Sequence, residues 1–406
     1  MRVNGRVAPE AEPLTSIEIC AGAGGQAVGL HDAGFRHLAL LEIDKHACQT
    51  LLDNVAQHPD WTGCQVVEGD VVDVDPFKHK QLAGFKLEPG DLDLLAGGVP
   101  CPPFSVAGRQ LGEHDERDLF PRMLELAEQL RPKAIMIENV RGILDEKFTP
   151  YRERIIKQIA DIGASEGGGY ELCGWELIEA RSYGVPQLRP RAILVMIDKK
   201  YMQDVKFEWP TGDEKILTVA EALKETMWER CKPHGAEGKA VFDKWLDKAT
   251  RRGSEAPTLV GGSKKHGGAD LGPSRAKAAW AALGVDAMGV ANDPEKCVPS
   301  RDLFRDNGPM LTVEQAAIIQ GFPRHWKFSG GKTARYRQVG NAFPPPVAEA
   351  VGKAIAAVLR PASDSGASQE TGHGPVEASL VPAARLGTEI GTTALDRIDD
   401  FEGASV

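Results

Sequence analysis

One cysteine in this chain has surroundings that suit it to covalent chemistry. Cys101 follows the apolar run 92–96 and stands inside the segment Gly97-Gly98-Val99-Pro100-Cys101-Pro102-Pro103. Three prolines in four positions prevent helical continuation and remove backbone N–H donors, so this loop is stiff and irregular. A thiolate presented at the end of a strand could act as a nucleophile. A small buried cysteine beside a proline turn is the competing interpretation.

An acid and two arginines could assist such a nucleophile. Glu138 follows the apolar run 134–137, and Arg189 and Arg191 precede the run 192–197. A carboxyl flanked by apolar residues has its pKa raised by desolvation and could share a proton near neutral pH. Strand alternation would place both guanidinium groups on one face, where they could stabilise negative charge. A turn-capping acid and arginines that blunt a strand edge are the alternatives.

A glycine turn and two acids suggest a nucleotide cofactor. Residues 17–27 read Ile-Glu-Ile-Cys-Ala-Gly-Ala-Gly-Gly-Gln-Ala, a run followed by G-x-G-x-x-A from Gly22. Glu42 ends the next apolar run, where a carboxylate could bind ribose hydroxyls. Asp70 follows a third run and could accept a hydrogen bond from an adenine amino group. A glycine turn without a ligand, and a strand-end acid that caps a turn, remain open.

The elements that must position these residues alternate along the chain. Short apolar or β-branched runs at residues 16–20, 37–43, 64–67, 92–96, 134–137 and 192–197 are separated by helical patterns. This alternation predicts an α/β fold, a mostly parallel sheet with helices on both faces. Ligands bind such sheets beyond the carboxyl ends of the strands, where Cys101 and Glu138 stand. Apolar spacing also predicts a helix over residues 119–130 that stops at Arg131-Pro132.

The length of 406 residues favours more than one domain. We expect an N-terminal extension (1–14), a catalytic and cofactor-binding domain (15–199 with 335–360), a smaller irregular domain (200–334) and an acidic disordered tail (361–406). Residues 338–360 offer a turn, three prolines and an Ala/Val-rich helix suited to packing back on the sheet.

Charge is sorted along the chain. The formal net charge of −10 opposes a nucleic-acid partner on average, but residues 251–277 carry six basic and two acidic side chains. Seven cysteines without a C-x-x-C pair argue against a disulfide framework and a zinc cluster, so we expect reduced thiols and no metal. Because no apolar run approaches the roughly 20 residues of a membrane span, we expect a cytoplasmic protein that does not contact a membrane.

Eight ordered blocks together resemble the C5-cytosine DNA methyltransferase family in its unpermuted motif order. They are IEICAGAGG, LEID, GD, GGVPCPPFSVAGRQ, ENV, QLRPR, LTVEQAAIIQGFP and RQVGNAFPPP, within residues 15–199 and 309–360. The resemblance implies a Rossmann-like methyltransferase domain that uses S-adenosyl-L-methionine, with a smaller irregular target-recognition domain. It also implies double-stranded DNA as substrate, a flipped cytosine, and a bacterial modification role beside a cognate restriction endonuclease.

The resemblance also implies roles for individual residues. Cys101 would add to cytosine C6, Glu138 would protonate or hydrogen-bond N3, Arg191 would contact the cytosine carbonyl, and Arg189 would position the catalytic loop and the flipped nucleotide. The implied cofactor-binding residues are Cys20, Ala21, Gly22, Gly24, Gly25, Glu42, Ile43, Asp70, Val71, Pro100, Asn341 and Ala342. The implied DNA-binding residues are Ser105, Arg109, Gln110, Thr258, Leu259, Lys264, Lys265, His266 and Arg275, with Thr258-Leu259 at the core of the recognition lobe.

Two positions depart from the family pattern. Cys20 stands where most members carry phenylalanine, which removes an aromatic stacking face for adenine. Pro309 stands where an arginine is common.

Three other functions compete with DNA methylation. A transfer RNA methyltransferase would use the same catalytic set, although the long intervening lobe with its basic segment favours duplex DNA. A catalytically silent DNA-binding regulator could keep the fold, but Cys101, Glu138 and Arg191 are intact. A thiol enzyme with a nicotinamide cofactor would leave the ENV and RQVGNA blocks unexplained.

Overall fold

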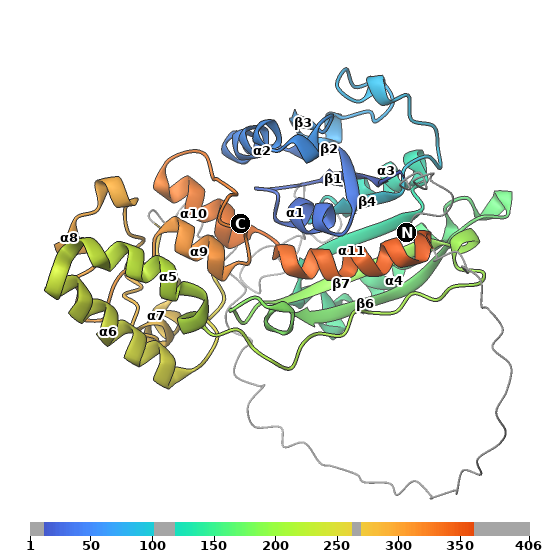
Figure 1. Cartoon of the computed structure of the whole chain (residues 1–406). Coiled ribbons are helices and arrows are strands. Elements are labelled where there is room, and N and C mark those ends of the chain that lie inside the picture. Colours follow the sequence, from blue (N-terminus) through green and yellow to red (C-terminus); the bar gives the residue numbers. More distant parts are fainter. Residues whose placement is uncertain (1–11, 101–117, 262–268, 361–406) are drawn as a thin grey trace, which may run out of the picture.

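One seven-stranded sheet forms the centre of the molecule (Figure 1). The computed structural model describes residues 12–100, 118–261 and 269–360. The strands lie in the order β3-β2-β1-β4-β5-β7-β6. Their bounds are β1 (Leu14–Ile19), β2 (Phe35–Glu42), β3 (Gln65–Glu68), β4 (Leu94–Gly97), β5 (Ala134–Val140), β6 (Tyr170–Glu179) and β7 (Pro190–Asp198). The first five in sequence are parallel, whereas β7 is antiparallel to β5 and to β6. The predicted α/β fold with a mostly parallel sheet is confirmed.

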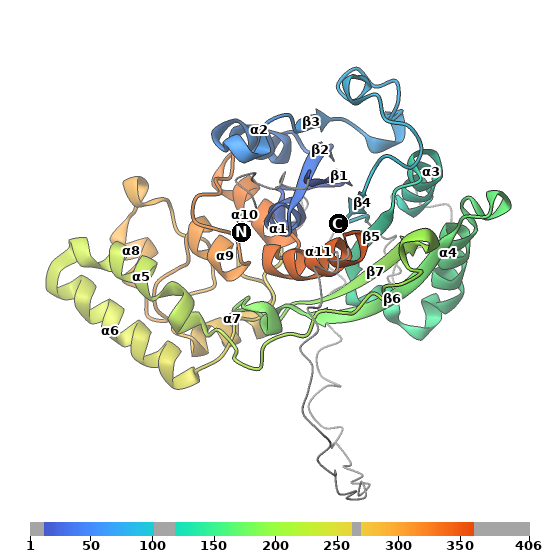
Figure 2. The ribbon, with the colours of Figure 1, turned by 45° about the vertical axis from the view of Figure 1, so that its right-hand side comes forward.

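Helices cover both faces of the sheet and build a second lobe (Figures 1 and 2). Their bounds are α1 (Gly25–Asp32), α2 (Lys45–Gln57), α3 (Phe120–Leu130), α4 (Thr149–Asp161), α5 (Val219–Cys231), α6 (Gly235–Arg252), α7 (Ser274–Ala282), α8 (Pro299–Asp302), α9 (Val313–Ile319), α10 (Lys332–Asn341) and α11 (Pro345–Leu359). The helix predicted over residues 119–130 is α3, and the chain leaves it at Arg131 with φ +45°, directly before Pro132.

Successive side chains of the central strands pack into two apolar layers, one on each face of the sheet. Leu95 of β4 packs with α3 and α4, whereas its neighbour Leu94 packs with α1 and α11. This follows from the pleat, which turns successive side chains to opposite faces. The described stretch Lys332–Leu359 is long and apolar enough to cross a membrane by composition. Much of its apolar surface, however, belongs to the layer between α11 and the sheet.

The sequence patterns did not reveal β6. This strand forms the sheet edge next to β7, and its sequence, YELCGWELIE, mixes charged and apolar residues. An edge strand buries fewer of its side chains than a central one, so the apolar run that identifies the other strands is missing. Gly174, with φ +145° at the register shift, interrupts it further.

The second lobe is more helical than the composition of residues 200–334 indicated. It contains α5 to α9, which occupy the left of Figure 1. Thr218 caps α5 with Glu221 in a reciprocal capping box, and Thr312 caps α9 with Gln315 in the same way. Gly253, in the left-handed conformation, ends α6. These local signals were present in the sequence, but the glycines and tryptophans between them obscured the helical spacing.

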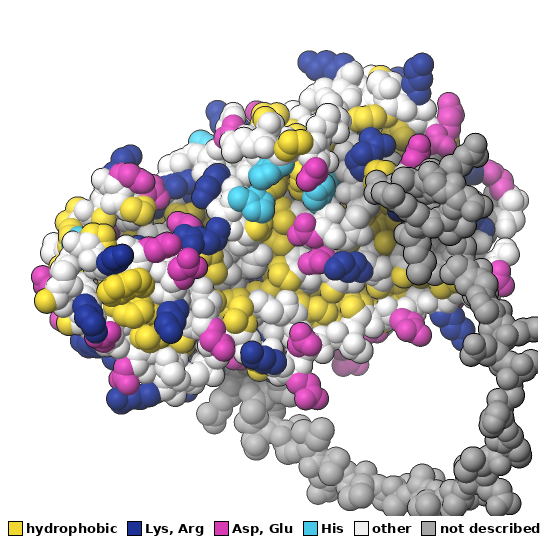
Figure 3. All heavy atoms as spheres, viewed as in Figure 1, with side chains coloured by type: hydrophobic (Ala, Val, Ile, Leu, Met, Phe, Trp, Pro, Cys, Tyr) yellow, Lys and Arg dark blue, Asp and Glu magenta, His cyan; other side chains and the backbone are white. Residues whose placement is uncertain are grey.

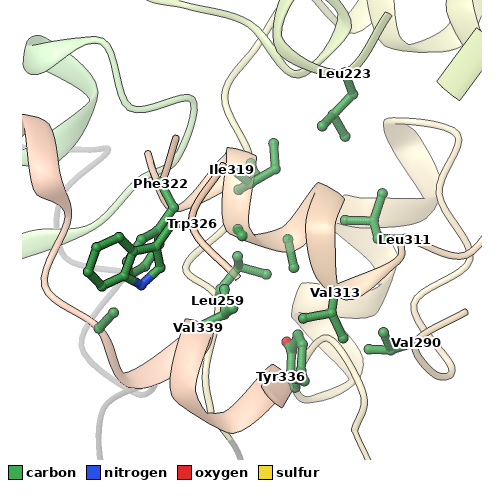
Figure 4. Close-up of a cluster of buried hydrophobic side chains, with 14 of the residues drawn as sticks. Leu223, Leu259, Val290, Leu311, Val313, Ile319, Phe322, Trp326, Tyr336 and Val339 are labelled. Carbon is green, nitrogen blue, oxygen red and sulfur yellow. The ribbon is translucent and has the colours of Figure 1, made fainter. Parts of the chain in front are cut away.

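The second lobe shares a core with the sheet domain. The chain after β7 first follows the sheet, because Trp209 Nε1 donates to Cys173 O at 3.0 Å. After α9 it returns, and Trp326 Nε1 donates to Ala23 O in the glycine turn at 2.9 Å. Figure 4 shows Trp326, Leu259, Ile319 and Val339 in one buried cluster. The two lobes are therefore held together by continuous apolar packing.

Candidate active site

Glu42 ties the glycine turn to the end of β2. Its Oε2 accepts a hydrogen bond from Gly22 N at 2.7 Å, and its Oε1 accepts from Ile43 N at 2.9 Å and Asp44 N at 2.8 Å. Gly22 has φ +53° and Gly24 has φ +86°, values that glycine adopts readily. The predicted neighbourhood of glycine turn and Glu42 is therefore present, with Glu42 also fixing the turn.

Exposed apolar side chains stand at two neighbouring strand ends. Ile43, after β2, is 66% exposed, and Val72, after β3, is 56% exposed. β2 and β3 pair in parallel through Glu42 and Glu68, so these ends are adjacent. A flat apolar ring such as adenine would bury such side chains favourably. The residues thus fit a nucleoside-type cofactor.

The other residues predicted at this end have different surroundings. Asp70 is exposed and caps the short 3₁₀ helix Val71–Asp73, accepting from Val72 N at 3.0 Å. Val71, predicted to bind the cofactor, is only 5% exposed and packs into the core. Its side chain therefore packs into the core, and the exposed valine is the next one, Val72. Burial, with the nearby charges of Glu42, Glu18 and Asp70, raises the pKa of the Cys20 thiol, so it stays protonated.

The turn after α10 lies against the glycine turn. A side chain on Gly25 would meet the Phe343 carbonyl at 2.2 Å and Ala342 Cβ at 3.1 Å, so only glycine allows this approach. Asn341 is exposed and Ala342 is buried. The structure thus brings Ala342, predicted from a block more than 300 residues away, to the first glycine block, with Asn341 next to it in the chain.

Glu138 and Arg191 meet at the ends of β5 and β7. Glu138 Oε1 lies 2.9 Å from Arg191 Nε, and the two side chains are 14% and 9% exposed. The antiparallel register explains this, because Val140 pairs with Arg191 and Glu138 with Ile193. The acid was predicted from its apolar flanks and from the family resemblance, and the structure adds its contact with Arg191.

The same strand end holds the stem of the cysteine loop. Asn139 Nδ2 donates to Val99 O at 2.9 Å, and a side chain on Gly98 would lie 3.0 Å from Glu138 Oε2. Pro100 follows and is exposed. Cys101, Ser105, Arg109 and Gln110 lie outside the described residues. The loop that carries Cys101 therefore begins beside the Glu138 carboxylate.

Arg189 occupies a different place from Arg191. It is 1% exposed and precedes β7; its Nη1 donates to Leu259 O, and its Nη2 donates to Gly340 O and Ala342 O. Strand alternation had suggested one shared face for the two arginines. Instead, Arg191 faces Glu138, whereas the Arg189 guanidinium joins carbonyls from two distant segments.

Of the residues predicted to bind DNA in the second lobe, some lie within the described ranges and some outside them. Leu259, predicted to bind DNA, is fully buried in the core, so its side chain anchors the segment instead. Thr258 donates its hydroxyl to Leu188 O at 2.5 Å. Arg275 is exposed in the first turn of α7. Lys264, Lys265 and His266 lie outside the described ranges.

Sequence reasoning missed four buried polar residues. Glu18 is 1% exposed, and burial, with the charges of Glu42 and Glu138, raises its pKa well above the usual value. Asn139, Gln187 and Gln320 each bridge two segments through hydrogen bonds. An acid inside an apolar run was a signal for Glu18. The other three stood within the family blocks, but their partners are remote in sequence.

On the face shown in Figure 3, acidic and basic side chains are interspersed over the helical lobe. The positive charge expected of a nucleic-acid surface is therefore not concentrated among the described residues of this face. The predicted basic segment contributes Arg251, Arg252, Arg275 and Lys277 to the described surface, and Lys277 is paired with Asp270 at 2.9 Å.

Residues 14–357 match the family model described as C-5 cytosine-specific DNA methylase. The chain is 46% identical over 352 residues to the "Type II methyltransferase M.NaeI" of Lentzea aerocolonigenes, covering 86% of this chain and 76% of that protein. It is also 46% identical over 352 residues to the "Type II methyltransferase M.NgoMIV" of Neisseria gonorrhoeae, covering 86% and 98%.

Two solved structures share the fold. One is a putative DNA modification methyltransferase encoded within a prophage in E. coli, with a TM-score of 0.55, 22% identity and coverage of 85% of this chain and 99% of the other. The second is a DNMT2 mutant from Spodoptera frugiperda, with a TM-score of 0.53, 15% identity and coverage of 86% and 100%.

Proposed function

The chain belongs to the C-5 cytosine-specific DNA methylase family, and we propose that it transfers a methyl group to C5 of a flipped cytosine in a specific double-stranded DNA sequence. The observation that supports this most directly is the Glu138–Arg191 pair beside the stem of the Cys101 loop. A pyrimidine ring attacked by a nucleophile on that loop would lie beside this acid and this cation.

Cys101 begins the proposed reaction. Its thiolate adds to cytosine C6, forming an S–C6 bond, and the C5–C6 π electrons move toward C5 and the ring. Glu138 donates a proton at N3, which leaves an enamine whose C5 is nucleophilic. Arg191 holds the Glu138 carboxyl in place and faces the cytosine carbonyl, where negative charge develops.

The reverse movements release the product. Once C5 carries the methyl group, its proton is lost to a base, the electron pair re-forms the C5–C6 double bond, and the Cys101 thiolate leaves. N3 returns its proton to Glu138. Cys101 and Glu138 therefore end the cycle as they began it.

S-adenosyl-L-methionine would supply the methyl group. Its nucleoside would be held by the glycine turn at Gly22 and by the Glu42 carboxylate. The apolar side chains of Ile43 and Val72 would cover the adenine ring. Asp70 stands beside them, with Oδ1 bonded to Val72 N.

We assign target recognition to the helical lobe, within the proposed range 200–334. Cytosine C5 is unreachable inside a duplex, so the base must leave the stack at a cost of about a few kcal/mol. Residues 251–277, with their excess of positive charge, are the proposed DNA-reading segment. A restriction endonuclease that recognises the same sequence is the proposed functional partner.

Labelled methyl donor tests the proposal directly. The purified protein is incubated with genomic DNA, with transfer RNA and without nucleic acid, and the label is followed into 5-methylcytosine. We expect label in DNA alone. Label in transfer RNA would identify the RNA-modifying alternative, and no transfer to either would favour the silent regulator.

The nucleophile is tested by trapping. DNA with 5-fluorocytosine at the target should form a covalent complex, because fluorine cannot leave as a proton does. Peptide mapping should place the adduct on Cys101, and Cys101→Ser should abolish methylation while sequence-specific DNA binding persists. An adduct on another cysteine would refute the assignment.

A further inference from the structure

Three buried side chains, Gln187, Arg189 and Gln320, form a polar junction. It lies between the proposed DNA-reading segment, residues 251–277, here called the recognition segment, and the turn after α10, which packs against the glycine turn of the proposed cofactor site. We propose that this junction couples DNA recognition to cofactor binding, with Gln320 as the positioning residue. The inference rests on the proposed function and adds a route by which the two ligands affect each other.

On one side, the junction forms hydrogen bonds with the backbone of Leu259 in the recognition segment. Gln187 Oε1 accepts a hydrogen bond from Leu259 N at 2.7 Å, and Arg189 Nη1 donates to Leu259 O at 2.7 Å. Both polar groups of the Leu259 backbone are therefore engaged. Ala256, three residues earlier, exchanges backbone hydrogen bonds of 2.8 Å with Pro186 and Leu188. The path of the chain into the proposed DNA-reading residues is thus fixed by the junction.

The same side chains hold the turn after α10 from the other side. Arg189 Nη2 donates to Gly340 O at 2.8 Å and to Ala342 O at 3.0 Å, and Gln320 Nε2 also donates to Ala342 O. Gln187 Nε2 donates to Gln320 Oε1 at 2.8 Å. A continuous path of hydrogen bonds therefore runs from Leu259 through Gln187 and Gln320 to Ala342.

Direct backbone contact accompanies these bonds. A Cβ on Gly340 would lie 2.5 Å from Gly261 N, and a Cβ on Gly261 would lie 2.1 Å from Asn341 Oδ1. The recognition segment and the α10 turn thus touch without an intervening side chain. Because the same turn packs against Gly25 of the glycine turn, a shift at Gly261 is transmitted to the proposed cofactor site.

Burial makes the junction sensitive to displacement. Gln187 and Gln320 are fully buried and Arg189 is 1% exposed. A buried donor or acceptor that loses its partner is not compensated by water, so the bonds resist partial opening. When DNA repositions Leu259, the amide path favours a matching position of Ala342. Linkage makes this effect reciprocal. If bound DNA raises cofactor affinity by some factor, bound cofactor must raise DNA affinity by the same factor.

Gln320→Leu interrupts this path with limited damage to the fold. Gln187 Nε2 keeps its bond to Ile319 O at 3.3 Å, and Ala342 O keeps Arg189 Nη2. Gln315→Leu is the matched control. Gln315 is 1% exposed in α9, and its amide bonds to Arg230 and Thr226 inside the helical lobe. It removes a comparable buried amide that touches neither end of the path.

The experiment measures the dissociation constant of the protein for a duplex that contains its methylation site, with and without S-adenosylhomocysteine. We expect the wild-type protein and Gln315→Leu to bind this duplex more tightly with the cofactor product, by a factor within the roughly 5–150-fold range of allosteric couplings. In Gln320→Leu the factor should fall below the wild-type value, and the coupling that remains is carried by Arg189, which still joins Leu259 O to Ala342 O. Gln320→Glu, which still accepts from Gln187 but as a carboxylate cannot donate to Ala342 O, should lose the same part of the coupling.

Hydrogen exchange gives a second readout that needs no DNA. S-adenosylhomocysteine should slow exchange of the amides at residues 256–261 in the wild-type protein and in Gln315→Leu, and should slow it less in Gln320→Leu. Wild-type coupling in Gln320→Leu, or equal loss of coupling in Gln315→Leu, would overturn the inference. A wild-type protein that methylates no DNA would instead overturn the proposed function, and the labelled-donor assay separates these outcomes.

Discussion

The Glu138 carboxylate lies 2.9 Å from Arg191 Nε, in a pair whose two side chains are almost fully buried. The acid comes from β5 and the guanidinium from its antiparallel neighbour β7. Because β7 reverses direction, a residue at its start reaches the carboxyl end of β5. The reversal therefore supplies a cation at the sheet edge where the Cys101 loop begins.

Glu138→Gln tests the chemical use of this pair. The amide keeps the size of the side chain but cannot deliver a proton to N3, so the single-turnover methylation rate should fall by about 10²–10⁴-fold. Cofactor affinity should be unchanged. Glu166→Gln, which removes the acid of the exposed pair with Arg131, is the control. Wild-type turnover in Glu138→Gln would show that the acid is not needed for the reaction. Thermal unfolding will show whether loss of the Glu138 charge beside Arg191 destabilises the fold.

Glu42→Ala should weaken cofactor binding. The substitution removes the proposed ribose contact, for which charged hydrogen bonds contribute about 1.5–3 kcal/mol. It also removes the acceptor of three backbone N–H groups that shapes the glycine turn. Calorimetry with the methyl donor measures the loss. Glu68→Ala, at the exposed position paired with Glu42 on β3, should bind normally. If Glu42→Ala binds the methyl donor with unchanged affinity, the glycine turn and Glu42 do not form one cofactor pocket.

Glu18→Gln should stabilise the protein at neutral pH. Burial, with the charges of Glu42 and Glu138, raises the pKa of Glu18 in the folded state well above 4.5. Above pH 4.5 the unfolded chain releases this proton while the folded protein keeps it. The wild type therefore loses up to about 1.4 kcal/mol of unfolding free energy per pH unit until the folded pKa is reached. The glutamine variant does not share this loss.

Urea unfolding of Glu18→Gln and the wild type across pH 5 to 8 measures that difference. The gap between their midpoints should widen as pH rises. Glu171→Gln, at an exposed position on β6, should follow the wild type. Parallel curves for Glu18→Gln and the wild type would mean that the Glu18 proton is not retained on folding.

Alanine substitutions at Lys264, Lys265, His266 and Arg275 should locate the DNA-reading contacts. A side chain that touches base edges should cost about 1–3 kcal/mol at the cognate site and relax discrimination at one position. A phosphate contact should weaken all sequences alike and flatten the salt dependence. Methylation of the cognate site and its single-base variants at two salt concentrations distinguishes these results. Lys239→Ala, in α6 of the same lobe, is the control, and four variants with unchanged rate and discrimination would place recognition elsewhere.

Local patterns in the sequence determined the parts of the site that stand at strand ends. Glu42, Asp70 and Glu138 each end or follow an apolar run, and parallel strands bring such residues to one edge. That rule does not determine which way a side chain turns. Asp70 caps the next turn, Val71 points into the core, and Leu259 is buried instead of exposed.

The sequence alone determined the parallel part of the sheet, the glycine turn, the strand-end acids and the family resemblance, because each depends on residues close together in the chain. Only the tertiary structure decided which remote groups meet. Gln187 and Gln320 stand 133 positions apart, and Glu138 finds Arg191 only because β7 runs antiparallel. A side-chain hydrogen bond between distant segments leaves no periodicity in the sequence, since its geometry is set by the packing of every element between them.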